Sequence, residues 1–117
     1  MNQVAIVFWS GTGNTEMMAN CIAGGVREAG GEAVLIAPGE FSAGRLDEFG
    51  AVAFGCPSMG VEQLEDGEFD PMFSEVEPSL SGRKIALFGS YGWGDGAWMR
   101  NWEQRCAAAG AVFFLSL

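Results

Sequence analysis

Five short apolar runs are spaced along the chain, and they constrain its fold more than any other feature. Each has four to six residues, mostly Val, Ile, Leu, Phe and Ala, and lacks the polar and apolar alternation typical of a strand with one solvated face. Such runs are typical of strands buried on both faces of a parallel sheet. The predicted strands are residues 3–8, 33–36, 51–54, 84–88 and 111–115.

Segments with helical periodicity lie between these runs. A helix is predicted over residues 16–29, opened by residues 12–15 and ended by two glycines. Its apolar stripe is Met17, Met18, Cys21, Ile22 and Val26. Three further helical segments are predicted: a short one at 43–48, a weak stripe at Phe69, Met72, Phe73 and Val76, and a helix at 97–109 with Trp98, Trp102, Cys106 and Ala109 on one side. This alternation predicts an open, doubly wound α/β sheet with right-handed crossovers.

The chain of 117 residues is long enough for one domain and is strongly acidic. Its 15 acidic and six basic residues give a net charge of −9, which disfavours nucleic acid and anionic membranes as partners. The charge either attracts basic protein surfaces or serves solubility alone. No apolar stretch approaches the ~20 residues of a membrane span, and no basic, cleavable leader precedes the first strand. The expected location is therefore the cytoplasm.

Three widely spaced cysteines, no CxxC pair and no histidine occur in the sequence. A zinc or iron–sulfur site is therefore not expected. Cys21, Cys56 and Cys106 are interpreted as reduced thiols that pack as small apolar side chains. The absence of histidine also removes the commonest general base.

The predicted chemistry lies in three glycine-rich segments, residues 9–15, 55–62 and 89–96, each of which follows a predicted strand. The carboxyl ends of parallel strands share one edge of the sheet, and open α/β sheets bind their ligands there. The first segment offers hydroxyls, a carboxamide and two glycines at the start of a helix, without lysine or arginine, which predicts an anion site of neutral donors. Met59 and Trp93, from the other two segments, could hold a planar ring between them.

Particular residues exclude the other common phosphate loops. The nucleoside triphosphate loop requires a lysine that residues 9–15 lack, and the dinucleotide fingerprint GxGxxG is only half present, at Gly11 and Gly13. A phospho-accepting receiver domain needs acidic residues after its first strand and an aspartate after its third, where this chain has Trp9-Ser10 and Gly55-Cys56. The remaining ligand is a mononucleotide with one phosphate and a flat ring.

The same segments resemble those of the flavodoxins, in their short-chain, clostridial-type form, over essentially the whole chain. The matching stretches are residues 9–16 (WSGTGNTE), 55–60 (GCPSMG) and 86–96 (ALFGSYGWGDG). The resemblance implies a flavodoxin-like α/β fold with five parallel strands in the order 2-1-3-4-5, and a single FMN-binding domain over residues 1–117. It also implies a low-potential, one-electron carrier with non-covalently bound FMN that shuttles electrons between redox proteins with basic surfaces, and not a stand-alone enzyme.

The resemblance assigns cofactor contacts residue by residue. The phosphate cradle would consist of Ser10, Gly11, Thr12, Gly13, Asn14 and Thr15. Met59 and Trp93 would enclose the flavin ring, and Met59-Gly60 matches the peptide that flips when the flavin is reduced. The other expected contacts are Ser58, Glu62, Ser90, Tyr91, Gly92 and Gly94. Trp9, Trp98 and Trp102 are interpreted as packing or rim residues.

Family members continue after the fifth strand with a final helix, which this sequence lacks up to Leu117. The expected C-terminal helix is therefore missing, and apolar groups beside the first and fifth strands would be exposed. A chain that ends early, a larger parent protein, or an oligomer in which a second chain covers the face would each account for this. Two alternative functions follow: a truncated or non-shuttling FMN-binding module, and an FMN-dependent reductase of a small substrate.

Overall fold

The computed structural model describes residues 3–9, 13–56, 67–89 and 97–116. Its centre is a sheet of five parallel strands in the order β2-β1-β3-β4-β5. The strands are β1 (Gln3–Phe8), β2 (Glu32–Ile36), β3 (Ala51–Gly55), β4 (Lys84–Phe88) and β5 (Val112–Ser116). Each predicted strand is confirmed to within one residue at either end, as are the parallel pairing and the strand order.

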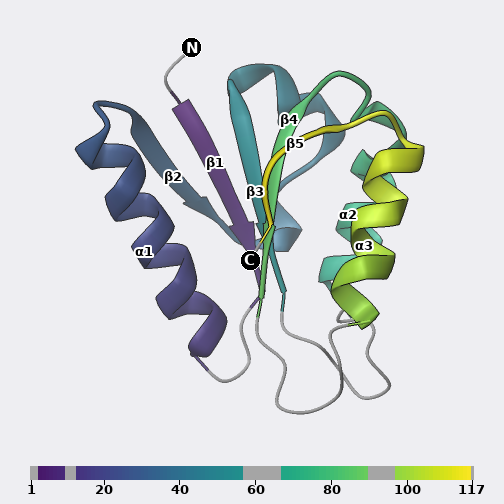
Figure 1. The fold of residues 1–117 in the computed structure, drawn as a ribbon, viewed down its shortest axis with the longest axis horizontal. Helices are drawn as coiled ribbons and strands as arrows, with labels where there is room; N and C mark the ends of the chain where they lie inside the picture. Colours follow the sequence, from purple (N-terminus) through teal and green to yellow (C-terminus); the bar gives the residue numbers. More distant parts are fainter. Residues whose placement is uncertain (1–2, 10–12, 57–66, 90–96, 117) are drawn as a thin grey trace.

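Helices cover both faces of the sheet. Figure 1 shows α1 (Asn14–Glu28) on one side and α2 (Phe69–Val76) with α3 (Ala97–Ala108) on the other. The described part of the connections contains three 3₁₀ segments, η1 (Pro38–Glu40), η2 (Ala43–Glu48) and η3 (Glu77–Ser79). The doubly wound arrangement is therefore confirmed, and the predicted short helix at 43–48 forms as the 3₁₀ segment η2. Among the described residues, no helix is long and apolar enough to cross a membrane.

The larger apolar core lies between the sheet and the α2 and α3 helices, and aromatic rings dominate it. Trp102 of α3 meets Phe69 and Phe73 of α2 edge-on, with ring centroids 5.4 and 5.7 Å apart. Phe73 in turn meets Phe54 of β3 edge-on, with the two centroids 5.2 Å apart. All four side chains are almost completely buried. The predicted apolar stripe of α2 and the packing role of Trp102 are thereby confirmed.

The second core lies between the sheet and α1, and small side chains build it. Ala19 and Ala23 of α1 pack with Ile6 of β1, Ala53 of β3 and Ala86 of β4, and all five are buried. Alanine contacts let a helix approach a sheet closely, because no side chain beyond the β-carbon separates the two backbones.

The predicted apolar stripe of α1 is partly wrong. Met17 is 68% exposed and Cys21 is also exposed, while Met18, Ile22 and Val26 are only partly buried. The fully buried positions of this helix are Thr15, Ala19 and Ala23, spaced four residues apart. The helical periodicity of α1 was predicted correctly, but the buried face of the helix is rotated toward the small residues. These residues allow the closest contact between helix and sheet.

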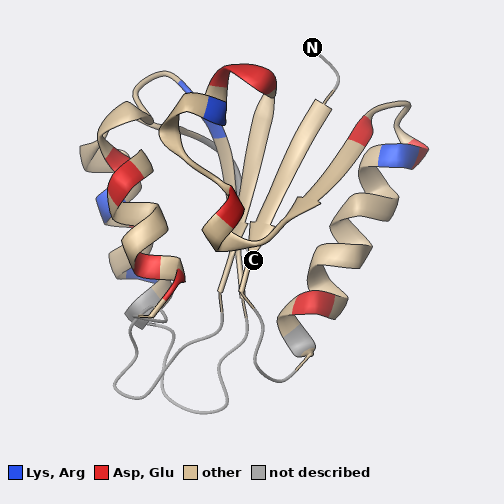
Figure 2. Ribbon diagram, turned by 180° about the vertical axis from the view of Figure 1, so that it is seen from behind, with Lys and Arg blue, Asp and Glu red and all other residues tan. Residues whose placement is uncertain are grey.

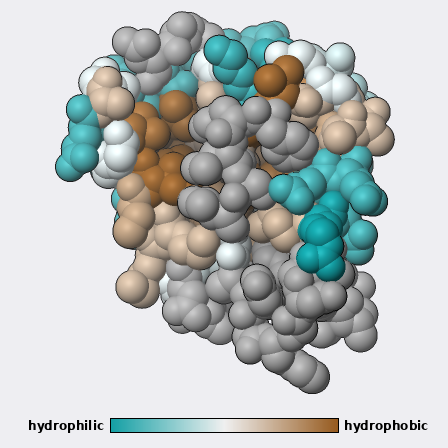
Figure 3. All heavy atoms as spheres, in the orientation of Figure 1, coloured by the Kyte–Doolittle hydropathy of each residue, from teal (hydrophilic) through white to brown (hydrophobic). Residues whose placement is uncertain are grey.

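A groove of about 360 Å³ lies beside the end of α1, at the amino edge of the sheet. Val4, Val26, Ala29 and Ala51 form part of its lining, together with Lys84. Figure 3 shows apolar side chains at the surface on the α1 side of this view.

A candidate cofactor site at the carboxyl edge of the sheet

Three strands end level with one another at the carboxyl edge of the sheet. Phe8 of β1 pairs with Gly55 of β3, and Gly55 pairs with Phe88 of β4. The ladder continues one step further, since the backbone N–H of Trp9 donates to the Gly55 carbonyl (3.0 Å) and that of Cys56 donates to the Phe88 carbonyl (3.1 Å). The three glycine-rich segments singled out from the sequence therefore begin side by side.

Gly55 and Phe88 fit together closely at this edge. A β-carbon on Gly55 would lie 2.2 Å from two atoms of the Phe88 ring, which is far inside van der Waals contact. The ring of Phe88 is fully buried and belongs to the core on the α1 side. Sequence reasoning missed this role of Gly55. A glycine at the end of a strand pattern was the available signal, since it often marks a close approach of neighbouring atoms.

The start of α1 has the features of an anion site. Its N-cap is Gly13, whose φ of 91° is in the left-handed region that favours glycine. Among the described residues, no side chain makes a cap hydrogen bond at this helix end. The N–H groups of a first helical turn can bind an anion, which a glycine at the N-cap lets approach closely.

Thr15, in the first turn of α1, is the decisive residue of this site. Its side chain is completely buried, and its Oγ1 has no hydrogen-bond partner among the described residues. A buried hydroxyl without a partner costs about 1–3 kcal/mol. A phosphate oxygen at this helix end would accept the missing hydrogen bond, so the residues present fit the phosphate of a mononucleotide.

The candidate anion site at the start of α1 offers neutral donors and a helix dipole, without a basic side chain. No lysine or arginine occurs in residues 9–15, 55–62 or 89–96. The N-terminus of a helix carries roughly half a positive elementary charge, which favours a bound anion. Within the described ranges, no group of three or more His, Cys, Asp or Glu side chains is placed to hold a metal ion.

Only part of the predicted contact set can be located. Gly13, Asn14 and Thr15 lie together at the start of α1, as predicted. Twelve predicted contacts lie outside the described residues: Ser10, Gly11, Thr12, Ser58, Met59, Gly60, Glu62, Ser90, Tyr91, Gly92, Trp93 and Gly94. Trp9 is partly buried and packs against the aromatic core, which agrees with its interpretation as a packing or rim residue.

The cysteines are free thiols, and two of them are buried. Cys56 and Cys106 belong to the core on the α2 and α3 side, as expected of small apolar side chains. Burial, and to a lesser degree the nearby Glu77 carboxylate, raise the pKa of the Cys106 thiol to about 12, against the opposing effect of Arg105. Cys21 is exposed on α1, so the prediction that it packs in the core is wrong.

An open α/β sheet of this strand order, with a neutral anion site where its first strand meets its first helix, defines a flavodoxin-like nucleotide-binding protein. The flavodoxin family model matches residues 6–117. The flavodoxin of Clostridium beijerinckii is 48% identical over 107 residues, which are 92% of this chain and 78% of that protein. The flavodoxin of Megasphaera elsdenii is 45% identical over 109 residues, covering 93% of this chain and 80% of the relative. The chain belongs to the flavodoxin family.

Solved structures agree with this assignment. The solution structure of two-electron reduced Megasphaera elsdenii flavodoxin superimposes with a TM-score of 0.92 at 43% identity, over 97% of this chain and 82% of that one. Flavodoxins bind FMN and transfer electrons to and from other redox proteins. The chain is therefore an FMN-binding electron carrier and not an enzyme, as its sequence predicted.

Proposed function

We propose that this protein is a low-potential, one-electron carrier that shuttles electrons between redox proteins with non-covalently bound FMN. Bound FMN supplies the redox chemistry, and the protein contributes binding, orientation and electrostatics. The observation that carries the proposal is the buried, unpartnered hydroxyl of Thr15 at a glycine-capped helix N-terminus.

The residues of the α1 N-terminus would hold the phosphate. Thr15 would donate its hydroxyl, and Gly13 and Asn14 would contribute at the capped helix end, with Ser10, Gly11 and Thr12 completing the predicted cradle. Met59 and Trp93 are the proposed ring contacts. The neighbouring contacts proposed for the ring are Ser58, Gly60, Tyr91, Gly92 and Gly94, with Glu62 near its N3 edge. Ser90 is proposed near the phosphate.

The low potential follows from the charge of the domain. A net charge of −9 with no cation in the three predicted contact segments disfavours further negative charge at the cofactor. Reduction that leaves negative charge on the cofactor is then less favourable than in water. The expected measurement is a midpoint potential for the second electron below that of free FMN, in an anaerobic spectroelectrochemical titration.

The proposed partners are redox proteins with basic surfaces. Glu16 lies in the first turn of α1 and Asp70 in the first turn of α2, so both are near the carboxyl edge of the sheet. In contrast, Arg27 near the end of α1, and Arg83 and Lys84 at the start of β4, lie toward the amino edge. Figure 2 shows acidic residues at both edges of the sheet, with basic residues among them near the amino edge. The acidic edge would orient a basic partner toward the cofactor.

The test of the phosphate site compares FMN with riboflavin, which lacks the phosphate. Thr15→Val keeps the shape of the side chain and removes the hydroxyl. We expect it to weaken FMN binding by roughly 10- to 100-fold, the value of a hydrogen bond to a charged group, and to leave riboflavin binding unchanged. Flavin fluorescence quenching measures both affinities, and Thr15→Ser should restore FMN binding. Equal losses for both flavins would contradict the proposed site.

The carrier function has its own test. The purified protein should bind FMN at micromolar concentration, exchange electrons with a flavoprotein reductase, and oxidise NAD(P)H only when that reductase is present. Failure to bind FMN would overturn the proposal. Oxidation of NAD(P)H by the isolated protein would indicate an FMN-dependent reductase, and bound FMN without exchange would indicate a non-shuttling module.

We propose in addition that residues 1–117 act as one FMN-binding domain in the cytoplasm. A second chain that covers apolar groups of the sheet face beside β1 and β5 would produce an oligomer. Sedimentation across a range of protein concentrations would detect that association.

A further inference from the structure

A groove of about 410 Å³ lies between α2 and the segment that follows β2. Phe41 and Met72 are buried apolar residues of its lining, and Pro38 and Pro71 add apolar surface on the two walls. Both walls begin at the carboxyl edge of the sheet, because Pro38 follows the end of β2 and Pro71 lies in the first turn of α2. The groove is therefore at the same edge of the sheet as the start of α1.

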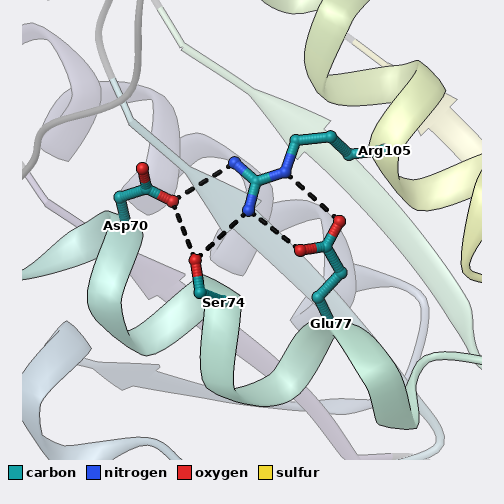
Figure 4. Close-up of polar contacts among 4 residues, drawn as sticks. All are labelled: Asp70, Ser74, Glu77 and Arg105. Carbon is teal, nitrogen blue, oxygen red and sulfur yellow. Dashed lines mark hydrogen bonds and ion pairs between the residues drawn. The ribbon is translucent and has the colours of Figure 1, made fainter.

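The acidic residues of α2 and its two ends lie on different faces of the helix. Asp70, Ser74 and Glu77 face α3, where Arg105 contacts all three (Figure 4). Nη2 of Arg105 donates to Glu77 Oε1 at 2.9 Å, and its Nη1 donates to Asp70 Oδ1 at 3.2 Å. The carboxylates on this face therefore have a cationic partner within the protein.

The face of α2 toward the groove carries two further carboxylates. Four residues line the groove from this side at spacings of three and four, the repeat of one helix face: Glu68, Pro71, Met72 and Glu75. Glu68 and Glu75 are both exposed. Glu75 Oε2 accepts a hydrogen bond from the Ala43 N–H at 2.9 Å, which ties α2 to the segment on the other side of the groove.

One basic residue, Arg45, lies near that other segment, and its donors are directed elsewhere. Its Nη1 donates to the Glu40 carbonyl at 3.0 Å, and its Nε and Nη2 donate to the carboxylate of Glu48 at 3.3 and 3.2 Å. The described residues that line the groove include no lysine or arginine. The groove therefore combines apolar walls with an acidic rim.

This lining is complementary to a side chain that is apolar along its length and positive at its end. Lysine and arginine have this form, because their methylene stems bury against apolar surface while the charged head stays at the rim. We propose that the groove is a docking site for a lysine or arginine side chain of a redox partner with a basic surface. Phe41 and Met72 would contact the stem, and Glu68 and Glu75 the head.

The position of the groove favours a redox partner as its occupant. A protein held there would lie at the edge of the sheet that carries the candidate cofactor site, and electron transfer requires the two redox centres to come close together. The inference rests on the proposed function, since it specifies where the proposed partner docks.

The first test separates the charge of the groove from the charge of the whole protein. Glu68→Gln combined with Glu75→Gln removes two negative charges at the groove and keeps an oxygen that can accept from the Ala43 N–H. Glu28→Gln combined with Glu32→Gln is the matched control, because it removes the same charge at exposed positions toward the amino edge. The measured quantity is the dissociation constant of the FMN-loaded protein, at physiological ionic strength, from the flavoprotein reductase with which the wild type exchanges electrons.

The second test concerns the space in the groove. Gly39 lines the groove, and a β-carbon there would meet nothing within 4 Å, so Gly39→Phe adds a ring at the groove without a clash at its base. Gly25→Phe is the matched control, since it adds the same bulk at an exposed and equally open position of α1, on the opposite face of the sheet. The affinity for FMN is measured for every variant and should equal that of the wild type.

We expect the double variant at the groove to raise the dissociation constant roughly three- to tenfold, the value of one or two partly exposed ion pairs. Gly39→Phe should raise it by a similar factor, because the ring occupies the place of the partner's side chain. The double variant at the amino edge should change it less than about twofold, because charges more than about 8 Å away are largely screened at this ionic strength. Gly25→Phe should leave it unchanged.

Three results would overturn the inference. Equal effects of the two double variants would show that the groove has no role beyond the net charge. An unchanged dissociation constant in Gly39→Phe would show that no side chain enters the groove. Self-association of the wild type that Gly39→Phe abolishes would assign the groove to a second copy of the chain. The proposed function fails separately, if the wild type does not bind FMN or does not exchange electrons with a reductase.

Discussion

Close packing between Gly55 and Phe88 shapes the carboxyl edge of the sheet, where the candidate cofactor site lies. The Phe88 ring occupies the space that a β-carbon on Gly55 would need, and both residues end strands from which predicted contact segments leave. The ring has no room to move because it is fully buried. At the same scale, the buried hydroxyl of Thr15 is the feature that makes the start of α1 a candidate phosphate site.

The first prediction concerns Gly55→Ala. We expect it to lower the free energy of unfolding by about 1–3 kcal/mol, the usual cost of overpacking a core, and less in a Phe88→Ala background because the ring is then gone. Gly25→Ala in α1, where nothing lies within 4 Å of the new β-carbon, is the control and should stabilise by about 0.5–1 kcal/mol. Urea unfolding is measured for the wild type, the three single variants and the double variant. A neutral Gly55→Ala would contradict the packing argument.

A second prediction at this scale concerns pH. The pKa of Cys106 is raised to about 12 in the folded protein, so the native state favours the protonated thiol. That contribution to stability is complete below the thiol's ordinary pKa of about 8.5 and is lost as the pH rises toward 12. We expect the stability of Cys106→Ala to fall less steeply with pH than that of the wild type above pH ~8.5. Parallel curves from urea unfolding would show that Cys106 does not contribute.

At the scale of elements, small side chains decide which face of α1 is buried. The larger apolar residues Met17 and Cys21 are exposed, and the completely buried row is Thr15, Ala19 and Ala23. Close contact of backbones at small residues outweighs the burial of longer side chains, which reach solvent beside the sheet. The same row places the Thr15 hydroxyl inward at the candidate site.

Because of this orientation, a leucine should lower the stability of the protein at a buried position of α1 and have little effect at an exposed one. Ala23→Leu forces a larger group between α1 and the sheet, and should destabilise the protein by about 1–3 kcal/mol. Cys21→Leu adds its bulk on the exposed side and should change stability by less than about 0.5 kcal/mol. Thermal or urea unfolding of the two variants provides the measurement, and equal effects would contradict the observed orientation of the helix.

At the scale of the whole molecule, the two edges of the parallel sheet differ in their charged residues. Arg27, Arg83 and Lys84 lie toward the amino edge together with the acidic residues Glu28, Glu32 and Asp47. The segments that leave the carboxyl edge hold Glu62, Glu65, Asp66 and Asp95 and no lysine or arginine. The proposed encounter with a basic partner therefore depends on the net charge of the carboxyl edge.

The corresponding prediction is kinetic. The association rate with a basic redox partner should fall steeply between low and physiological ionic strength, because salt screens charges separated by more than about 8 Å. Asp70→Asn removes one carboxylate near the carboxyl edge together with its ion pair to Arg105, and Glu16→Gln removes another carboxylate at the same edge. Each variant should lower the rate at low salt only. Stopped-flow electron transfer measures both effects, and a rate that does not change with salt would rule out electrostatic steering.

Much of the fold and part of the candidate site can be predicted from the sequence. Continuous apolar runs predicted all five strands, because a strand buried on both faces has no solvated side to interrupt the pattern. The strand order and the family came from the resemblance of three motifs, and both are confirmed. Gly13, Asn14 and Thr15 could be assigned to a helix start because glycine and hydroxyl residues directly follow a strand.

The amino-acid pattern alone indicates which segments become strands and helices, and which edge of the sheet carries the glycine-rich segments. Local periodicity and backbone preference suffice for both. Only the tertiary structure decided that α1 buries Ala19 and Ala23, that Phe88 fills the space beside Gly55, and that Arg105 joins α3 to α2. The physical reason is that these contacts depend on distances between elements far apart in sequence, to which no local pattern is sensitive.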